Sequence, residues 1–413
     1  MTVFLDGKFF KNLRKQGEGL CNLVLAVVNE NDHEIVWRFR KAKKSKELCV
    51  DADITKLVNL IQNVFQPLLD RRYLPSPRIV SFKKEAVERI FSSSSELRQF
   101  ISPSIASSVD RIEALEMPNY TCLNLSGGLK KAGTIGPVIA VELKPKQGTR
   151  FAAGSNSMTG GDALDSPYCM NCLMQIGKYQ QGQYEDMYDF CPLDLYSNDD
   201  DRIKRSLYAL LRSPHHNLII SKDKRIIFSD TQCPEFDNLV HSLFPSGDLN
   251  MDDFVTLLCK LLMNTLKPCS WLQHHAKQVD QNDNKDISVL KTLLNVQDDD
   301  KLGLFGAKAL WESLPGNLKL DINDPYVLLT ADETQRHKWA CRYPTYMEDL
   351  FRLKRYLIAA TVRDCSVMIT FQQINAKNVN NCPLIKSNIH SNTRSIAASN
   401  SPSDVNETSQ DYL

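Results

Sequence analysis

The sequence predicts a protein of mixed α-helices and β-strands with two domains or lobes. Its 413 residues are enough to bury two sizeable hydrophobic cores. The first part contains short apolar runs typical of strands, whereas much of the second part repeats leucines at helical spacing. The composition, 42% hydrophobic and 24% charged, is ordinary for a globular protein.

Composition also excludes several classes of protein. No run of about 18 apolar residues is present, so no membrane span is expected, and the N-terminus lacks the pattern of a secretory signal. Twelve scattered cysteines indicate reduced thiols inside a cell, in the cytoplasm and/or the nucleus. The net charge of +1 argues against general nucleic-acid binding, and we expect a monomer.

A β-hairpin is predicted near the N-terminus. Gly17-Glu18-Gly19 precedes an apolar strand at Asn22–Val28, a turn and a second strand at Glu34–Phe39. Glycines at such a position let backbone N–H groups approach a nucleotide phosphate. A single G-x-G is also typical of an ordinary turn, so the pattern alone leaves both interpretations open.

A basic run follows the hairpin. Arg38–Lys46 contains six cations in nine residues, which suits a solvated surface, a nuclear-import patch or a site for a very acidic ligand. This run contains a single aromatic residue, Phe39, and the charge of the whole chain is nearly balanced, which argues against RNA binding. After the basic run, the sequence predicts an amphipathic helix at Asp53–Leu69, with one apolar stripe made of Leu57, Leu60, Ile61, Val64, Phe65 and Leu68. A short helix is predicted at Lys83–Phe91.

The central strand is predicted at Val138–Val141, and charged residues follow it directly. Glu142, Lys144 and Lys146 alternate along an extended segment, so their side chains point the same way. Pro145 stiffens the backbone between the two lysines. Two cations held at a strand end suit a phosphate, although a strand that ends in a solvated charged loop gives the same pattern.

The second half of the sequence is predicted to be mainly helical. Helical patterns are predicted for 201–212, 236–244, 252–266, 286–296 and 346–362. The last one leads into a strand through Asp364, where an acid would either face a cleft or serve as a turn residue. Cys169 and Cys172 have the spacing of half a zinc site or a redox pair. Because Cys191 stands alone in the sequence, we interpret that spacing as coincidence.

Three separated blocks resemble one family in the same order. VELKPKQG (141–148), FCPLDLYS (190–197) and TVRDCSVMI (361–369) are similar to signatures of the inositol-pentakisphosphate 2-kinases, and weaker similarity extends from about Gly17 to Phe371. The resemblance implies a two-lobed α/β (α+β) inositol polyphosphate kinase fold, distantly like protein kinases, with ATP in the crevice between the lobes. The expected lobes are residues 1–120 and 121–371, followed by a disordered tail at 372–413.

The resemblance also implies roles for individual residues. Lys144 would lie against the transferred phosphate, and Asp364 would accept the proton of the attacking 2-hydroxyl of inositol pentakisphosphate, giving inositol hexakisphosphate. Expected substrate contacts are Lys43, Arg111, Lys146 and Asn217. Expected contacts to ATP, with its Mg²⁺, are Gly17, Glu18, Gly19, Asn22, Arg38, Asn119, Glu142 and Met368. Some members carry a structural Zn²⁺, whose ligands we leave unassigned here, as we do those of Mg²⁺.

The chain departs from the family pattern in several places. Asn171 and Gln175 stand where the family has His and Lys, a basic residue is absent near Ile219, and Lys178 is expected to compensate in part. No D-L-D-x-K-P-like segment follows Gln372, so the chain is expected to end within a variable insertion that precedes it. The alternative function is therefore an impaired or non-catalytic relative that binds inositol polyphosphates.

Overall fold

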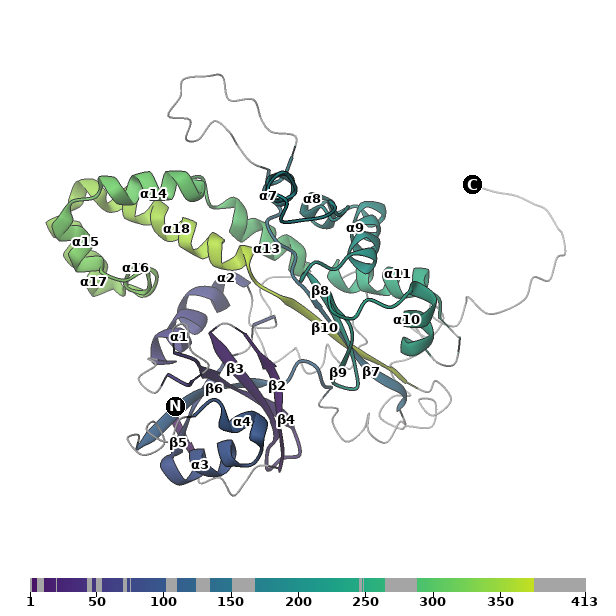
Figure 1. Ribbon diagram of the computed structural model, residues 1–413. Helices are drawn as coiled ribbons and strands as arrows, with labels where there is room; N and C mark the ends of the chain where they lie inside the picture. The colour runs from purple at the N-terminus through teal and green to yellow at the C-terminus, as the bar shows by residue number, and fades with distance from the viewer. Residues whose placement is uncertain are drawn as a thin grey trace, which may run out of the picture.

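The strands form two separate sheets, each packed on its own hydrophobic core, and a helical extension contains a third core (Figure 1). This arrangement is seen in a computed structural model. It describes residues 2–5, 11–19, 21–42, 47–49, 54–69, 73–74, 76–101, 110–123, 134–150, 168–244, 247, 249–263 and 288–374. The expected tail therefore lies outside the described residues from 375 onward, but its first residues belong to a strand that ends at Ile374.

The first sheet has six strands in the order β1-β5-β6-β4-β3-β2. They are β1 (Thr2–Leu5), β2 (Lys11–Glu18), β3 (Asn22–Val28), β4 (Glu34–Arg40), β5 (Arg78–Lys83) and β6 (Arg111–Pro118). Alternate residues of β3 and β4 enter the core, where Trp37 meets Phe82 edge-on with ring centroids 4.7 Å apart. Helices α3 (Lys84–Ser92) and α4 (Ser95–Arg98) supply the rest of this core.

The predicted hairpin is confirmed as β3 and β4, which pair in antiparallel register from Asn22↔Arg40 to Val28↔Glu34. Its turn is held by the Asn29 side chain, which accepts hydrogen bonds from the N–H groups of Asn31 and His33, both at 3.0 Å. Strand β2 was not predicted, because its sequence KNLRKQGE is polar and lacks alternation. The glycine turn consequently joins β2 to β3.

The predicted helix at Asp53–Leu69 contains an unexpected π-helical turn. It comprises α1 (Ile54–Leu60), the π turn η1 (Ile61–Phe65) and α2 (Gln66–Leu69). The wider turn shifts the phase of the apolar stripe, and Leu68, expected inside, is 40% exposed. Ile54 and Val58 pack on the first sheet, whereas Val64 and Phe65 belong to the core of the second. A sequence segment expected in the first lobe thus joins both cores.

The second sheet has four antiparallel strands in the order β10-β7-β8-β9. They are β7 (Thr134–Leu143), β8 (Leu218–Lys222), β9 (Arg225–Phe228) and β10 (Val367–Ile374). Ile139, Val141 and Leu143 of β7 face the core and are at most 2% exposed. The alternation expected for the charged residues stops at Lys146, whose φ of 61° is left-handed. Lys146 therefore leaves the strand direction that Glu142 and Lys144 share.

Helices pack around the second sheet near the positions predicted. They are α7 (Met170–Gln180), α8 (Pro192–Leu195), α9 (Asp200–Arg212), α10 (Phe236–Leu243), α11 (Met251–Leu262) and α13 (Val289–Asp298). Asp199 caps α9 by accepting the N–H of Arg202 at 2.9 Å. The acidic cluster at 199–201 therefore caps a helix, as its position suggests.

The helical extension, labelled α14 to α18 in Figure 1, projects away from the second sheet, and its helix α16 packs against α1. It comprises α14 (Gly303–Ser313), α15 (Gly316–Ile322), α16 (Pro325–Thr330), α17 (Glu333–Arg342), η3 (Pro344–Tyr346) and α18 (Met347–Arg363). Only α18 was predicted from the sequence. Leu318, Ile322 and Trp339 form the centre of its core. Among the helices described, none is long and apolar enough to cross a membrane.

Glu34 forms a polar contact between the two sheets. Its carboxylate accepts hydrogen bonds from Arg14 at 2.5 Å, from Asn119 at 2.8 Å and from Lys224 in the turn between β8 and β9. Burial alone would raise the pKa of Glu34, but the hydrogen bonds from Lys224 and Arg14 hold it below the ordinary glutamate value. Glu34 therefore joins the sheets as a carboxylate.

The substitution Glu34→Gln should lower the free energy of unfolding by about 1–3 kcal/mol at neutral pH, because it leaves two cations without their anion. A carboxylate whose pKa is lowered on folding stabilises the fold above its ordinary pKa and loses this effect as pH falls. The difference from the wild type should therefore vanish as pH falls below 4.5. Urea unfolding across this range measures it, with exposed Glu30→Gln from the same hairpin as control. A difference that persists in acid would contradict the assignment.

Candidate active site

The end of β7 lies beside the beginnings of two other strands. β7 is antiparallel to both neighbours, and Leu143 is registered with Leu218 of β8 and with Val367 of β10. Lys144, Asn217 and Asp364 therefore meet at one edge of the sheet although they are far apart in the sequence. The N–H of Lys144 donates to the carbonyl of Asn217 at 2.8 Å. This edge gathers most residues expected to bind substrate or act in catalysis.

Lys146 and Asp364 form an open ion pair at this edge, with Nζ 3.7 Å from Oδ1. Asp364 ends α18, and its side chain is 82% exposed, whereas that of Lys146 is 31% exposed. Pairs exposed to water contribute only about 0–1 kcal/mol to stability. The pair is thus a pre-positioned cation and carboxylate that a ligand can separate easily.

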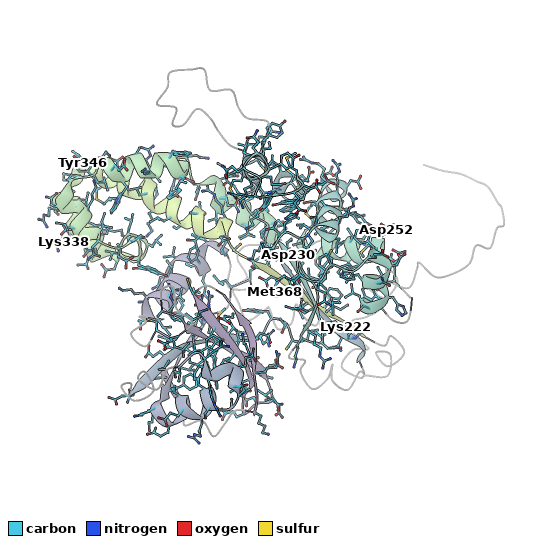
Figure 2. All side chains as sticks on the ribbon, viewed as in Figure 1. Lys222, Asp230, Asp252, Lys338, Tyr346 and Met368 are labelled. Carbon is cyan, nitrogen blue, oxygen red and sulfur yellow. The ribbon has the colours of Figure 1, made fainter. Side chains whose placement is uncertain are left out.

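Glu142 and Met368 lie opposite each other on the sheet face away from the core. Glu142 accepts a hydrogen bond from Ser366 at 2.8 Å, and Met368 is labelled on β10 in Figure 2. Thr370, two residues along the same face, donates to the carbonyl of Tyr120 from the first lobe. The face with Glu142 and Met368 therefore adjoins the segment that leaves the first sheet.

The side chain of Asn119, which was expected to contact adenine, is buried and hydrogen-bonded within the first lobe. It is 3% exposed, and its amide donates to Glu34 while its side-chain oxygen accepts from the N–H and hydroxyl of Thr121. These bonds fold the segment after β6 into a turn. The contact with adenine remains a prediction, and it would fall on the neighbouring backbone rather than on this amide.

The glycine turn leaves open space beside the first sheet. A Cβ at Gly17 or Gly19 would meet no atom within 4 Å. Glu18, expected to bind the cofactor, accepts a hydrogen bond from Lys41 at 2.7 Å, and Lys41 also donates to the carbonyl of Gly19 at 3.0 Å. Asn22 accepts the N–H of Gly19 through its carbonyl at 2.9 Å. Glu18, Lys41 and Asn22 thus hold the turn, whose open surface suits close approach by a phosphate.

Arg38 and Arg111 share the sheet face that is turned away from the aromatic core. Arg38 is registered with Leu115, which packs against Ile54 and Val58 of α1. Arg111 begins β6, so it lies seven strand positions from Pro118, about 23 Å. The strand therefore places Arg111 and Asn119 at opposite ends. Lys43 lies outside the described residues.

Residues near Asn217 that depart from the family pattern have structural partners. Gln175 is 4% exposed and accepts the N–H of Tyr188 at 3.2 Å. Tyr188 stacks on His215 with ring centroids 3.8 Å apart, and burial lowers the pKa of His215. Lys178 donates to Tyr184 at 3.1 Å, and the ring of Tyr184 is 5.6 Å from that of His215. Lys178 therefore points toward the group of rings that supports Asn217.

His216 and Asn171 are held by separate contacts. His216 pairs with Asp230, labelled in Figure 2, through its ring and through its N–H at 2.6 Å. His215 and His216 both have positive φ, so this pairing holds a backbone conformation that side chains disfavour. Asn171 donates to the carbonyl of Phe190 at 3.5 Å.

A buried amide, not predicted from the sequence, holds the lysine segment in place. Gln297 of α13 is 0% exposed. Its Nε2 donates to the carbonyl of Lys146 at 3.1 Å, and its Oε1 accepts the N–H of Gly148 at 2.8 Å. The hydroxyl of Tyr196 lies 3.2 Å from the same Nε2 and donates to the same carbonyl at 3.3 Å. A Cβ at Gly148 would overlap the Tyr196 ring. No local sequence signal indicates Gln297.

A buried ion pair fixes the end of α18 next to Asp364. Arg363 donates to Asp300 at 2.6 Å, and the side chain of Asp300 is 1% exposed. The other oxygen of Asp300 accepts the N–H groups of Leu302 and Gly303 at 2.8 and 3.1 Å. Removing one partner of such a pair leaves a buried charge, which costs about 3–5 kcal/mol. The position of Asp364 therefore depends on Asp300, also absent from the sequence prediction.

Cys191, which stands alone in the sequence, lies beside Cys169 and Cys172 in the structure. Its Sγ lies 3.9 Å from that of Cys169, which is 3.3 Å from that of Cys172. The 18 residues between Cys172 and Cys191 form α7 and a returning loop, and this return brings the third thiol to the other two. The three thiols form a cluster outside the strand edge described above.

Comparison with known proteins identifies the family. Residues 16–409 match the family model of inositol-pentakisphosphate 2-kinase. The chain belongs to the inositol-pentakisphosphate 2-kinase family. The match continues beyond Phe371, where the resemblance was expected to fade, into residues outside the described part of the chain.

Individual relatives agree with this assignment. An inositol-pentakisphosphate 2-kinase from Danio rerio is 25% identical over 366 residues, covering 77% of this chain and 73% of the relative. One from Arabidopsis thaliana is 24% identical over 420 residues, covering 91% and 84%. One from Drosophila melanogaster is 29% identical over 150 residues, covering 31% and 24%. The chain is thus an enzyme of a kinase family, and its β7 edge is the candidate active site.

The substitution Gln297→Met keeps the side-chain volume but removes the donor to Lys146 and the acceptor for Gly148. Losing these bonds at a buried site is worth about 1–3 kcal/mol, so kcat/KM for the inositol phosphate should fall about 10- to 100-fold. The KM for ATP should not change if Lys146 contacts the inositol phosphate, as the resemblance implies. Steady-state kinetics measure both, with exposed Gln180→Met as control. A fall in thermal stability with unchanged kinetics would assign Gln297 to folding alone.

Proposed function

We propose that this chain transfers the γ-phosphate of ATP to the 2-hydroxyl of inositol 1,3,4,5,6-pentakisphosphate, giving inositol hexakisphosphate and ADP. The observation that carries the proposal is the meeting of Lys144, Lys146 and Asp364 at one edge of the second sheet. Two cations and one exposed carboxylate, held on separate strand ends, match what phosphoryl transfer to an anionic alcohol needs.

Each side chain then has a separate task. Lys144 neutralises the transferred phosphate, and Lys146 exchanges its weak pairing with Asp364 for a phosphate of the substrate. Asp364, freed from that pairing, accepts the proton of the attacking hydroxyl. Asn217, 2% exposed and bound through its backbone to Lys144, orients the substrate from the position just before β8. Positioning and charge neutralisation account for most of the catalysis in this mechanism.

The residues present fit ATP with Mg²⁺. The open glycine turn suits a triphosphate, and the half-buried face with Glu142 and Met368 suits the nucleoside. The carboxylate of Glu142 is an oxygen donor of the type that Mg²⁺ prefers. Bound with ATP, Mg²⁺ supplies further charge neutralisation at the phosphates.

Incubation with radiolabelled ATP and inositol pentakisphosphate, followed by anion-exchange chromatography, tests the proposal. The expected product is inositol hexakisphosphate labelled on the 2-phosphate. Tight binding of inositol pentakisphosphate in calorimetry without any label transfer would instead indicate a non-catalytic binding protein. Label on another hydroxyl would overturn the assigned regiochemistry.

The substitution Asp364→Asn should lower kcat about 10²- to 10⁴-fold, the usual contribution of a general base. Affinity for ATP should stay the same, because the amide has the same volume and the carboxylate lies on the substrate side. Rapid-quench kinetics and calorimetry measure the two quantities, and Asp237→Asn on exposed α10 is the matched control. Unchanged kcat would show that Asp364 only ends its helix.

The substitution Lys144→Ala should lower kcat/KM about 10- to 100-fold, the effect of losing one charge-assisted hydrogen bond. The fold should survive, since the hydrogen bond from Lys144 to Asn217 uses the backbone. Lys338→Ala, on the helical extension (Figure 2), controls for loss of a surface cation. Full activity in Lys144→Ala would remove this lysine from the phosphate site.

A further inference from the structure

Three thiols from two segments form a cluster outside the candidate active site. Cys169 precedes α7 and is 0% exposed, Cys172 lies in its first turn, and Cys191 precedes α8. The Sγ atoms are 3.3 Å apart for Cys169 and Cys172 and 3.9 Å apart for Cys169 and Cys191, and all three lie within 4.8 Å of one another. The cluster takes no part in the proposed reaction.

These separations suit a tetrahedral metal centre. Thiolates at about 2.3 Å from zinc lie about 3.8 Å apart in a tetrahedron. The observed separations of 3.3 and 3.9 Å lie on either side of that value, whereas a disulfide requires about 2.05 Å. Only small rotations of the three side chains are needed to place all sulfurs at bonding distance from one ion.

Thiolates, not thiols, are the zinc ligands, so the three cysteines would release their protons to solvent as the metal binds.

We propose that Cys169, Cys172 and Cys191 bind one Zn²⁺ ion, with a water molecule or small exogenous thiol as the fourth ligand. Three soft thiolates in tetrahedral geometry select zinc over the hard cations that carboxylates bind. Among the described residues, no other His, Cys, Asp or Glu completes the group. This inference does not depend on the proposed function.

The ion would tie together two segments that support the active-site edge. Through Gln175, α7 holds Tyr188 against the ring of His215, next to Asn217. The segment after Cys191 carries Tyr196, which donates to the carbonyl of Lys146. Zinc at the cluster would therefore fix α7 relative to α8 and, through them, both the β8 and β7 sides of the edge.

Cobalt titration of the reduced, chelator-treated full chain tests the site. We expect one Co²⁺ per chain with the intense visible bands of a tetrahedral ion and the charge-transfer absorption of three thiolates, both abolished by one equivalent of Zn²⁺. Zinc should also raise Tm. A spectrum without thiolate charge transfer, or no uptake by reduced protein, would overturn the proposal.

Variants identify the ligands. Cys172→Ala and Cys191→Ser should each reduce uptake from one ion to none and remove the increase of Tm with zinc. Cys341→Ser is the matched control, because Cys341 is exposed and its Sγ lies 3.6 Å from His337, a thiol and imidazole pair outside the cluster. Uptake lost only in Cys341→Ser would overturn the assignment. The thiolate absorption of the wild type reports the ligand count even where a variant fails to fold.

Discussion

The position of β7 between β8 and β10 is the constraint on which the active-site edge depends. Because both neighbours are antiparallel to it, one end of β7 must lie beside the beginning of each. Lys144, Asn217 and Asp364 come from distant parts of the chain and meet there for that reason. A shift of one residue in either register would turn these side chains to the opposite face.

Buried polar groups hold this edge, while exposed charges remain available for ligands. Gln297 and Asp300 are almost completely buried, and each satisfies backbone groups of the segment it supports. Asp364 and Lys146, by contrast, meet in a long and exposed ion pair. Buried hydrogen bonds fix backbone positions because leaving them unmade is costly, whereas an exposed pair exchanges partners readily. Buried residues therefore fix the backbone at this edge, and exposed residues are available to contact ligands.

The two sheets are joined by contacts that differ in character. The helix formed by α1, η1 and α2 contributes apolar residues to both cores. Glu34 joins the sheets through charge, and Thr370 joins β10 to Tyr120 through one hydrogen bond. Of these contacts, the hydrogen bond of Thr370 lies on the same face of the second sheet as Glu142 and Met368.

The sequence by itself determined the features that depend on neighbouring residues. The β3–β4 hairpin, the helix at 200–212, the lysines after β7 and the acid between α18 and β10 all follow from periodicity and strand ends within short windows. Three similar blocks were enough to indicate the family, which the comparison confirms. These local signals located most of the residues at the edge.

Only the tertiary structure decided which distant residues support the residues at this edge. Gln297 contacts Lys146 across about 150 positions, Lys224 reaches Glu34 from another sheet, and Cys191 joins Cys169 after a helix and a loop. The π turn in the helix at 54–69 and the pairing of polar β2 likewise arise from packing. Such partners are chosen by the burial of two surfaces against each other, and burial between segments far apart in the chain leaves no periodic pattern in either segment.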